Sequence, residues 1–158
     1  MRLRKELEAP SIPEEKLLAV RTRLEAVEKL FEQNKPTEEA IREFNQFTGR
    51  VYTADKLRYY NAVESIDAFC RKAARPKPQR VLDISREELL EVVRRAMPTT
   101  RDPDYEYYME LFDAQVAMPC ASGLIFWPDD SREIDISTYD PTPEEIVDKA
   151  LAYKPIHL

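Results

Sequence analysis

The sequence predicts an all-α protein whose second half is a small domain of four helices. The chain of 158 residues contains only two glycines, whereas sheet proteins need glycine in their turns and bulges. Apolar residues recur at helical spacing in segments that are separated by prolines, of which there are 12. At several segment starts a Ser or Thr precedes a Glu by three residues, which is the capping-box pattern of a helix N-terminus. A chain of this length can bury one substantial core or two small ones.

The first half of the chain carries three helical segments, which we expect at residues 11–34, 36–49 and 53–73. Capping residues or prolines bound each segment, and the apolar residues within it recur at helical spacing. Gly49 is placed where a left-handed residue ends the second helix, and the third helix is expected to break near Asn61. The boundary signals are Ser11–Glu14, Lys35–Pro36 and Thr53, and the apolar positions are Leu17, Val20, Leu24, Val27, Phe31, Ile41, Phe44, Phe47, Leu57, Tyr60, Val63, Ile66 and Phe69.

Residues 75–80, Arg-Pro-Lys-Pro-Gln-Arg, have the composition of an extended spacer, because the residue before a proline is pushed out of helical geometry. We therefore place a domain boundary here. Residues 1–80 are expected to form an N-terminal helical domain of unknown role, and residues 81–158 the four-helix domain. Six residues also fit an ordinary loop inside one compact domain, and the sequence leaves this alternative open.

Two full-length helices open the second half. The first begins with the capping box Ser85–Glu88 and ends before Pro98. In the second, Asp102 is the expected cap and Pro103 the first helical residue, and the helix is expected to reach about Ala117. Pro98 therefore separates the first two helices of the second half.

The third helical segment is the run from Met118 to Pro128, in which four large apolar side chains stand between two prolines. We expect it to form a single helical turn or a short extended piece that presents one or two aromatic rings outward. Leu124, Ile125 and one of the two rings are expected in the core. The last helix starts with the capping box Thr142–Glu145. The inward stripes of the first and last helices are Leu89, Val92, Val93 and Ala96, and Ile146, Val147, Ala150 and Leu151.

The helix over residues 103–117 has two distinct faces. Its core stripe comprises Tyr108, Leu111, Phe112 and Gln115. The second face combines four carboxylates with a tyrosine and a methionine, and comprises Asp102, Tyr105, Glu106, Met109, Glu110 and Asp113. Such a face is either solvated, with its first carboxylates complementing the helix dipole, or it is a contact surface. The aromatic residues Phe126 and Trp127, followed by Asp129 and Asp130, favour a contact surface, because aromatic anchors surrounded by charge are typical of interface hot spots.

The two halves of the chain differ in charge. Residues 1–80 carry 17 Lys and Arg against 13 Asp and Glu, a net charge of +4, whereas residues 81–158 carry 7 against 17, a net charge of −10. The acidic half repels nucleic acid phosphates, so we expect no direct binding of DNA or RNA there. It attracts a basic protein instead.

Residues 83–155 resemble the immunity proteins of colicin- and pyocin-type DNases. The order of parts is the same: a capped first helix, an acidic second helix, a short third segment and a last helix that begins with Pro. The segment from Pro119 to Pro128, Pro-Cys-Ala-Ser-Gly-Leu-Ile-Phe-Trp-Pro, is similar to the family's Pro-Ser-Gly-Ser-Asp-Leu-Ile-Tyr-Tyr-Pro. Residues 142–147, Thr-Pro-Glu-Glu-Ile-Val, are similar to its Ser-Pro-x-Gly-Ile-Val. The resemblance implies an antiparallel four-helix bundle that neutralises a cognate nuclease toxin.

The resemblance also implies roles for individual residues. In the family, variable residues of the second helix choose the partner, and the face from Asp102 to Asp113 matches them. Phe126 and Trp127 stand at the two Tyr positions that supply shared contacts, and Gly123 stands where the family has Asp, so a toxin with a more apolar contact patch is expected. Family members bind beside the nuclease active site and keep nucleic acid out by bulk and by negative potential. The resemblance does not extend to the first 80 residues.

The sequence lacks the residues that catalytic, metal-binding and phosphate-binding sites require. His157 is the sole histidine, which excludes a multi-histidine metal site or a supported triad, and two glycines cannot build a phosphate loop. Cys70 and Cys120 have no metal-ligand spacing and are expected to be packing residues. Residues 129–140 match a calcium loop superficially but lack its Gly and its bidentate Glu. We expect no enzymatic activity, no cofactor and no metal.

Partner and location follow from the same observations. No apolar run approaches the roughly 18 residues of a membrane span, and no signal peptide opens the chain, so a cytoplasmic protein that does not bind membranes is expected. The expected partner is a cognate basic nuclease toxin domain. The alternative is a helical adaptor or structural protein whose acidic half docks on its own basic half. The sequence leaves open the oligomeric state and whether the toxin cleaves DNA or RNA.

Overall fold

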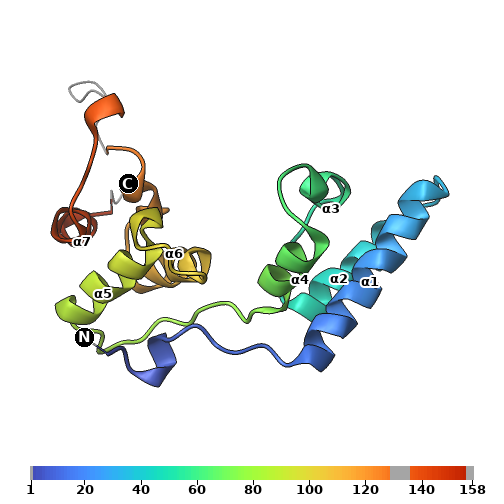
Figure 1. Cartoon of the computed structure of the whole chain (residues 1–158), viewed down its shortest axis with the longest axis horizontal. Coiled ribbons are helices and arrows are strands. Elements are labelled where there is room, and N and C mark those ends of the chain that lie inside the picture. Colours follow the sequence, from blue (N-terminus) through green and yellow to red (C-terminus); the bar gives the residue numbers. More distant parts are fainter. Residues whose placement is uncertain (1, 129–135, 156–158) are drawn as a thin grey trace. The chain divides into compact units, whose positions relative to one another are not determined.

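The computed structural model describes residues 2–128 and 136–155 of the chain (Figure 1). Within these residues the secondary structure consists of seven α-helices and several short 3-10 helices, without a strand. The predicted all-α class is therefore confirmed. None of the helices in these ranges is long and apolar enough to cross a membrane.

The chain folds into two compact units. The N-terminal unit comprises residues 10–77, and the C-terminal unit comprises residues 1–9 and 78–158. The chain thus begins in the C-terminal unit, leaves it to build the N-terminal unit and returns at the predicted spacer. Dividing the sequence at residue 80 assigns residues 1–9 to the first unit, whereas in the structure they are part of the second.

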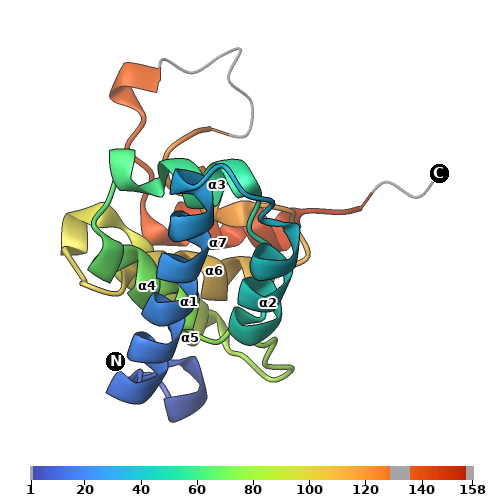
Figure 2. The same ribbon diagram turned by 90° about the vertical axis from the view of Figure 1, so that its right-hand side faces the viewer.

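The N-terminal unit is built around its longest helix, α1 (Glu14–Glu32). This helix packs against α2 (Glu38–Thr48), α3 (Ala54–Tyr59) and α4 (Ile66–Ala74) (Figure 2). The shared core contains Val20, Leu24, Val27, Phe44, Leu57, Tyr60, Phe69, Cys70, Ala73 and Ala74. Tyr52 packs against this core. The centroid of its ring lies 5.6 Å from that of Phe44 and 5.2 Å from that of Phe69.

The boundaries of these helices follow local signals with one exception. Gly49 adopts the left-handed conformation, with φ of 71°, directly after α2, as predicted. The predicted break near Asn61 is a 3-10 turn, η2 (Tyr60–Ala62), and it leaves Val63 80% exposed outside the core. The expected capping box at Ser11 is wrong: α1 begins at Glu14 behind Pro13 without a side-chain cap.

The C-terminal unit contains α5 (Arg86–Ala96), α6 (Tyr105–Gln115) and α7 (Pro143–Ala152), and the 3-10 helices η3 (Pro98–Thr100), η4 (Ala121–Ile125) and η5 (Ile136–Thr138). Helix α5 packs against both α6 and α7 (Figure 1). The short helix η4 also contacts α6 and α7. The predicted four-helix arrangement with a very short third member is confirmed. Both predicted capping boxes, at Ser85 and Thr142, are present.

An N-terminal arm, which we define as residues 2–9, completes the core of the C-terminal unit. Leu3 and Leu7 are buried in the same apolar cluster as α5, α6 and α7. Between them, the guanidinium of Arg4 contacts both the carboxylate of Asp83, at 3.0 Å, and that of Glu88, at 2.9 Å. The backbone N–H of Ala9 donates to the hydroxyl of Tyr108 at 3.2 Å. Two leucines four residues apart are too few to establish a helical pattern, so this arm was not predicted.

Gln115, the polar member of the predicted core stripe, bonds to the backbone at the point where the chain returns to the C-terminal unit. Its amide oxygen accepts the backbone N–H of Val81 at 2.8 Å, and its amide nitrogen donates to the carbonyl of Gln79 at 2.8 Å. Gln115 is only 5% exposed, and these two bonds explain how a polar amide is accommodated in the core. The extended spacer is therefore bonded to the end of α6.

Candidate partner-binding surface

Helix α6 presents the two faces that its sequence predicts. All four residues of the predicted core stripe, Tyr108, Leu111, Phe112 and Gln115, are buried. On the second face, Tyr105 and Glu110 are exposed, whereas Asp102, Glu106, Met109 and Asp113 are half-buried. The side chain of Met109 packs against the core, so it contributes less open surface than expected. Tyr107, which the pattern did not place inside, is buried as well.

The start of α6 differs from the prediction. The helix begins at Tyr105, two residues after Pro103, and its cap position is Asp104. Asp102 is not the cap: its carboxylate accepts the backbone N–H of Asp104 at 2.8 Å in the turn before the helix. Arg101 precedes this turn in the left-handed conformation. The carboxylate of Asp102 is thus engaged in shaping the entry to α6.

Charge on α6 is of one sign. The helix carries the carboxylates of Glu106, Glu110 and Asp113 and no basic residue. The tyrosine hydroxyl at position 105 donates to the carboxylate of Glu106 at 3.4 Å. Three arginines of α5 form ion pairs with carboxylates of α5 and α7, Arg86 with Asp148, Arg94 with Glu91 and Glu144, and Arg95 with Glu91. Arg95 also donates to the hydroxyl of Tyr108 in α6 at 3.1 Å. The acidic character of this face is therefore not offset from within α6.

The short third segment presents both of its aromatic rings. Leu124 and Ile125 are buried in η4, as predicted, whereas Phe126 is 39% exposed and Trp127 59% exposed. The expectation that one of the two rings joins the core is wrong, because the buried positions of this turn are taken by Ala121, Leu124 and Ile125. Two adjacent exposed rings lie directly after a turn that packs on α6.

Two side chains from outside η4 bond to it, one from α6 and one from the residue that follows η5. The carboxylate of Asp113, in α6, accepts the backbone N–H of Ser122 at 2.7 Å through Oδ1 and the hydroxyl of Ser122 at 2.7 Å through Oδ2. The hydroxyl of Tyr139 donates to the carbonyl of Leu124. Asp113, which the sequence places among the contact residues, is therefore engaged inside the protein.

We call Tyr105, Glu106, Glu110, Phe126 and Trp127 the α6–η4 surface. The first three lie on α6, and the two rings directly follow η4. Helix α6 and η4 contact each other, and the Asp113–Ser122 pair joins them. Asp129 and Asp130, which the sequence adds to this set, lie outside the described residues, as does most of the calcium-like loop of residues 129–140. In the described part of the chain no group of three or more His, Cys, Asp or Glu is arranged to hold a metal ion.

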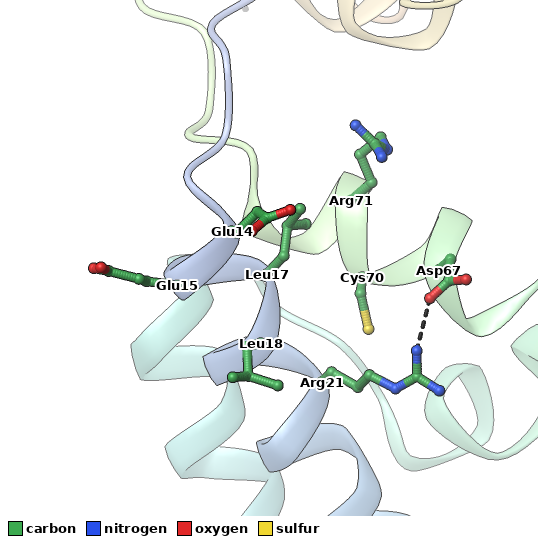
Figure 3. A pocket seen from close by; sticks show the side chains of 8 residues that line it. All are labelled: Glu14, Glu15, Leu17, Leu18, Arg21, Asp67, Cys70 and Arg71. Atoms are coloured by element: carbon green, nitrogen blue, oxygen red, sulfur yellow. Dashed lines mark hydrogen bonds and ion pairs between the residues drawn. The ribbon is translucent and has the colours of Figure 1, made fainter.

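The N-terminal unit has a groove of about 570 Å³ between α1 and α4 (Figure 3). Arg21 crosses it and pairs with Asp67 at 2.7 Å. The thiol of Cys70 lines the groove but is only 3% exposed, and burial raises its pKa to about 11. The thiol is therefore protonated at neutral pH and is a poor nucleophile. Cys70 is a packing residue, as predicted, whereas the same prediction is wrong for Cys120, which is exposed.

Comparison with known proteins finds a similarity over part of the chain. The chain is 36% identical over 72 residues to the uncharacterized protein YezA of Bacillus subtilis (strain 168). The matched segment is 45% of this chain and 93% of YezA, so YezA is about half as long. No protein-family model matches the chain, and no solved structure matches it.

Proposed function

We propose that this chain, which belongs to the family of the Bacillus subtilis protein YezA, is an immunity protein that binds and inhibits a bacteriocin-type nuclease toxin. The observation that carries the proposal is the α6–η4 surface, where two adjacent exposed rings accompany an acidic helix. The partner is a basic nuclease domain, and the α6–η4 surface is where it docks. Inhibition follows from covering the nucleic acid site and from placing negative charge beside it.

The exposed rings favour a protein partner. A side chain of tryptophan or phenylalanine loses its contact with water when it is buried at an interface, and aromatic residues dominate interface hot spots. Phe126 and Trp127 are adjacent and at least 39% exposed, so both can be buried by one partner. Truncation of such a hot-spot residue to alanine typically weakens the free energy of binding by about 2 kcal/mol or more.

The charge of the C-terminal unit indicates which kind of protein it binds. Residues 81–158 have a net charge of −10, and the charged residues of α6, which contacts η4, are all carboxylates. A negative surface accelerates the encounter with a positive partner and repels the phosphates of nucleic acid. A nuclease presents such a positive surface where it binds its substrate.

The resemblance to DNase immunity proteins supports the same conclusion, with differences at three contact residues. The third-segment Asp of that family is Gly123, and its two tyrosines are Phe126 and Trp127. The loss of one carboxylate and two phenol hydroxyls makes this part of the surface more apolar. We therefore propose a toxin whose contact patch is apolar at its centre and basic around it.

The test is inhibition of bacteriocin-type nuclease domains, including any encoded beside this chain's gene, by the full-length protein. We expect tight binding in a titration and loss of cleavage of plasmid DNA or of RNA. The double substitution F126A/W127A is expected to weaken binding at least 100-fold, because two hot-spot rings are removed. L82A is the matched control, since Leu82 is 93% exposed in the same unit but lies outside the α6–η4 surface.

Two outcomes contradict the proposal. If the wild-type chain inhibits none of these nucleases, the immunity function fails. If F126A/W127A inhibits as strongly as L82A, the assignment of the docking surface fails. A decrease in affinity between 50 and 200 mM salt supports the electrostatic part, since screening weakens attraction between exposed charges.

A further inference from the structure

The turn that carries the exposed rings is held at its beginning by one carboxylate. Both oxygens of Asp113 are used: Oδ1 accepts the backbone N–H of Ser122 and Oδ2 accepts its hydroxyl, each at 2.7 Å. Hydrogen bonds to a carboxylate are stronger than those between neutral groups. Asp113 belongs to the last turn of α6, a helix whose inner face is buried, so the bonds tie η4 to a firmly packed element.

The same turn is held near its end by a tyrosine. The hydroxyl of Tyr139, which follows η5, donates to the carbonyl of Leu124. Gly123 lies between the two residues that are held, Ser122 and Leu124. Its carbonyl accepts the backbone N–H of Phe126 at 3.0 Å and that of Trp127 at 2.9 Å. The ring-bearing backbone is therefore bonded directly to the residue between the two tethers.

Without such tethers a turn of this kind is weak. A 3-10 helix of five residues has poor hydrogen-bond geometry and few bonds of its own. Burial of Leu124 and Ile125 anchors its inner side, but burial cannot restrain rings that are left in solvent. Ordering rotamer-rich side chains at an interface costs free energy on binding, and a rigid surface avoids part of that cost.

We infer that Asp113, with Ser122 and Tyr139, is a positioning residue that presets the orientation of Phe126 and Trp127 before the partner arrives. This deepens the proposed function and rests on it for the partner. It also changes the role that the sequence predicts for Asp113. Its carboxylate acts through η4 instead of meeting a basic group of the partner.

The free protein provides the first test, because Trp127 is the sole tryptophan of the chain. Time-resolved fluorescence anisotropy of the full-length protein reports the local motion of this ring. D113A is expected to increase the amplitude of that motion, whereas D113N, which keeps an acceptor for the Ser122 N–H and a donor for its hydroxyl, is expected to restore most of the wild-type restraint. Unchanged motion of Trp127 in D113A overturns the inference.

A matched control separates positioning from general destabilisation. T142A removes the side-chain cap of α7 in the same unit and leaves both bonds between Asp113 and Ser122 in place. It is expected to lower stability while leaving the anisotropy decay of Trp127 unchanged. If T142A mobilises Trp127 as much as D113A does, the motion reflects overall loosening, and the positioning role is wrong.

Binding provides the second test, with one of the nuclease domains that the wild-type chain inhibits. Positioning predicts that D113A weakens binding about 10-fold and that D113N binds nearly as the wild type does. A direct ion pair with the partner predicts instead that D113N is as damaging as D113A, and that result overturns the inference. If Trp127 is mobilised in D113A while no nuclease is bound by the wild type, positioning stands and the proposed immunity function alone fails.

Discussion

At the scale of single residues, the two glycines of the chain have opposite structural roles. Gly49 ends α2 with φ of 71°, a conformation that side chains with a Cβ rarely adopt. Gly123 lies inside η4 without a positive φ, and a Cβ built there meets no atom within 4 Å. Only the first position needs glycine for its backbone. The second is open to a side chain, including the carboxylate that the immunity family carries there.

We therefore expect substitution by alanine to have opposite effects at the two glycines. G123A should raise the free energy of unfolding by about 0.4–1 kcal/mol, because it reduces the entropy of the unfolded chain without strain. G49A should lower it by about 1–2 kcal/mol, because a Cβ is placed in the left-handed region. Urea unfolding followed by circular dichroism measures both. A destabilised G123A would mean that the turn is not open to a side chain.

At the scale of helices, the capping box of α5 is linked to the N-terminal arm through Glu88. Its carboxylate accepts the backbone N–H of Ser85 at 2.9 Å and two bonds from the guanidinium of Arg4. The bond from Ser85 and, after it, the bond from Arg4 lower the pKa of Glu88 below its ordinary value of 4.5. One ionised side chain thus completes the helix start and holds the arm.

This shift predicts a specific pH dependence. Because the pKa of Glu88 is lower in the folded than in the unfolded protein, its stabilisation is fully present above about pH 4.5 and is lost as the pH falls through the folded-state pKa. E88Q is expected to be less stable than the wild type by roughly 0.2–1 kcal/mol at pH 7, because Gln keeps the capping box but loses the ion pair with Arg4. That difference should narrow in urea titrations below pH 4. The neighbouring exposed residue provides the control E87Q, for which a smaller difference is expected; an E88Q deficit that is constant with pH would contradict the linkage.

At the scale of the whole molecule, the chain enters the C-terminal unit twice. The arm contributes Leu3 and Leu7 to its core, with 2% and 0% of their surfaces exposed, and the rest of the unit begins only at residue 78. The N-terminal unit is therefore an insertion between two parts of one folding unit. A fragment that starts at residue 81 lacks two leucines of the core and the partner of Glu88.

We expect L7A to destabilise the C-terminal unit selectively. Removal of a fully buried leucine side chain typically costs about 2–5 kcal/mol. Hydrogen exchange should show reduced protection of the amides in α5, α6 and α7, with little change in α1–α4. L18A is the control, because Leu18 is 65% exposed in the N-terminal unit. Loss of protection confined to the N-terminal unit would show that the arm is not part of the C-terminal core.

Most of the candidate surface was predictable from the sequence, because its signals are periodic. The spacing within α6 separates the buried Leu111 and Phe112 from the exposed Tyr105 and Glu110. The pattern does not show which group each polar side chain bonds to. Asp113 has the same spacing as its acidic neighbours, and only the approach of Ser122 from η4 turns it inward.

The sequence by itself determined the helical class, the capping boxes at Ser85 and Thr142, the left-handed end at Gly49 and the break near Asn61. Each of these depends on residues within a few positions of one another, where backbone geometry and capping decide the outcome. Only the tertiary structure decided that the N-terminal arm joins the second unit and that both rings of η4 stay exposed. Such outcomes depend on which distant surfaces compete for the same buried space, and a local pattern does not contain that information.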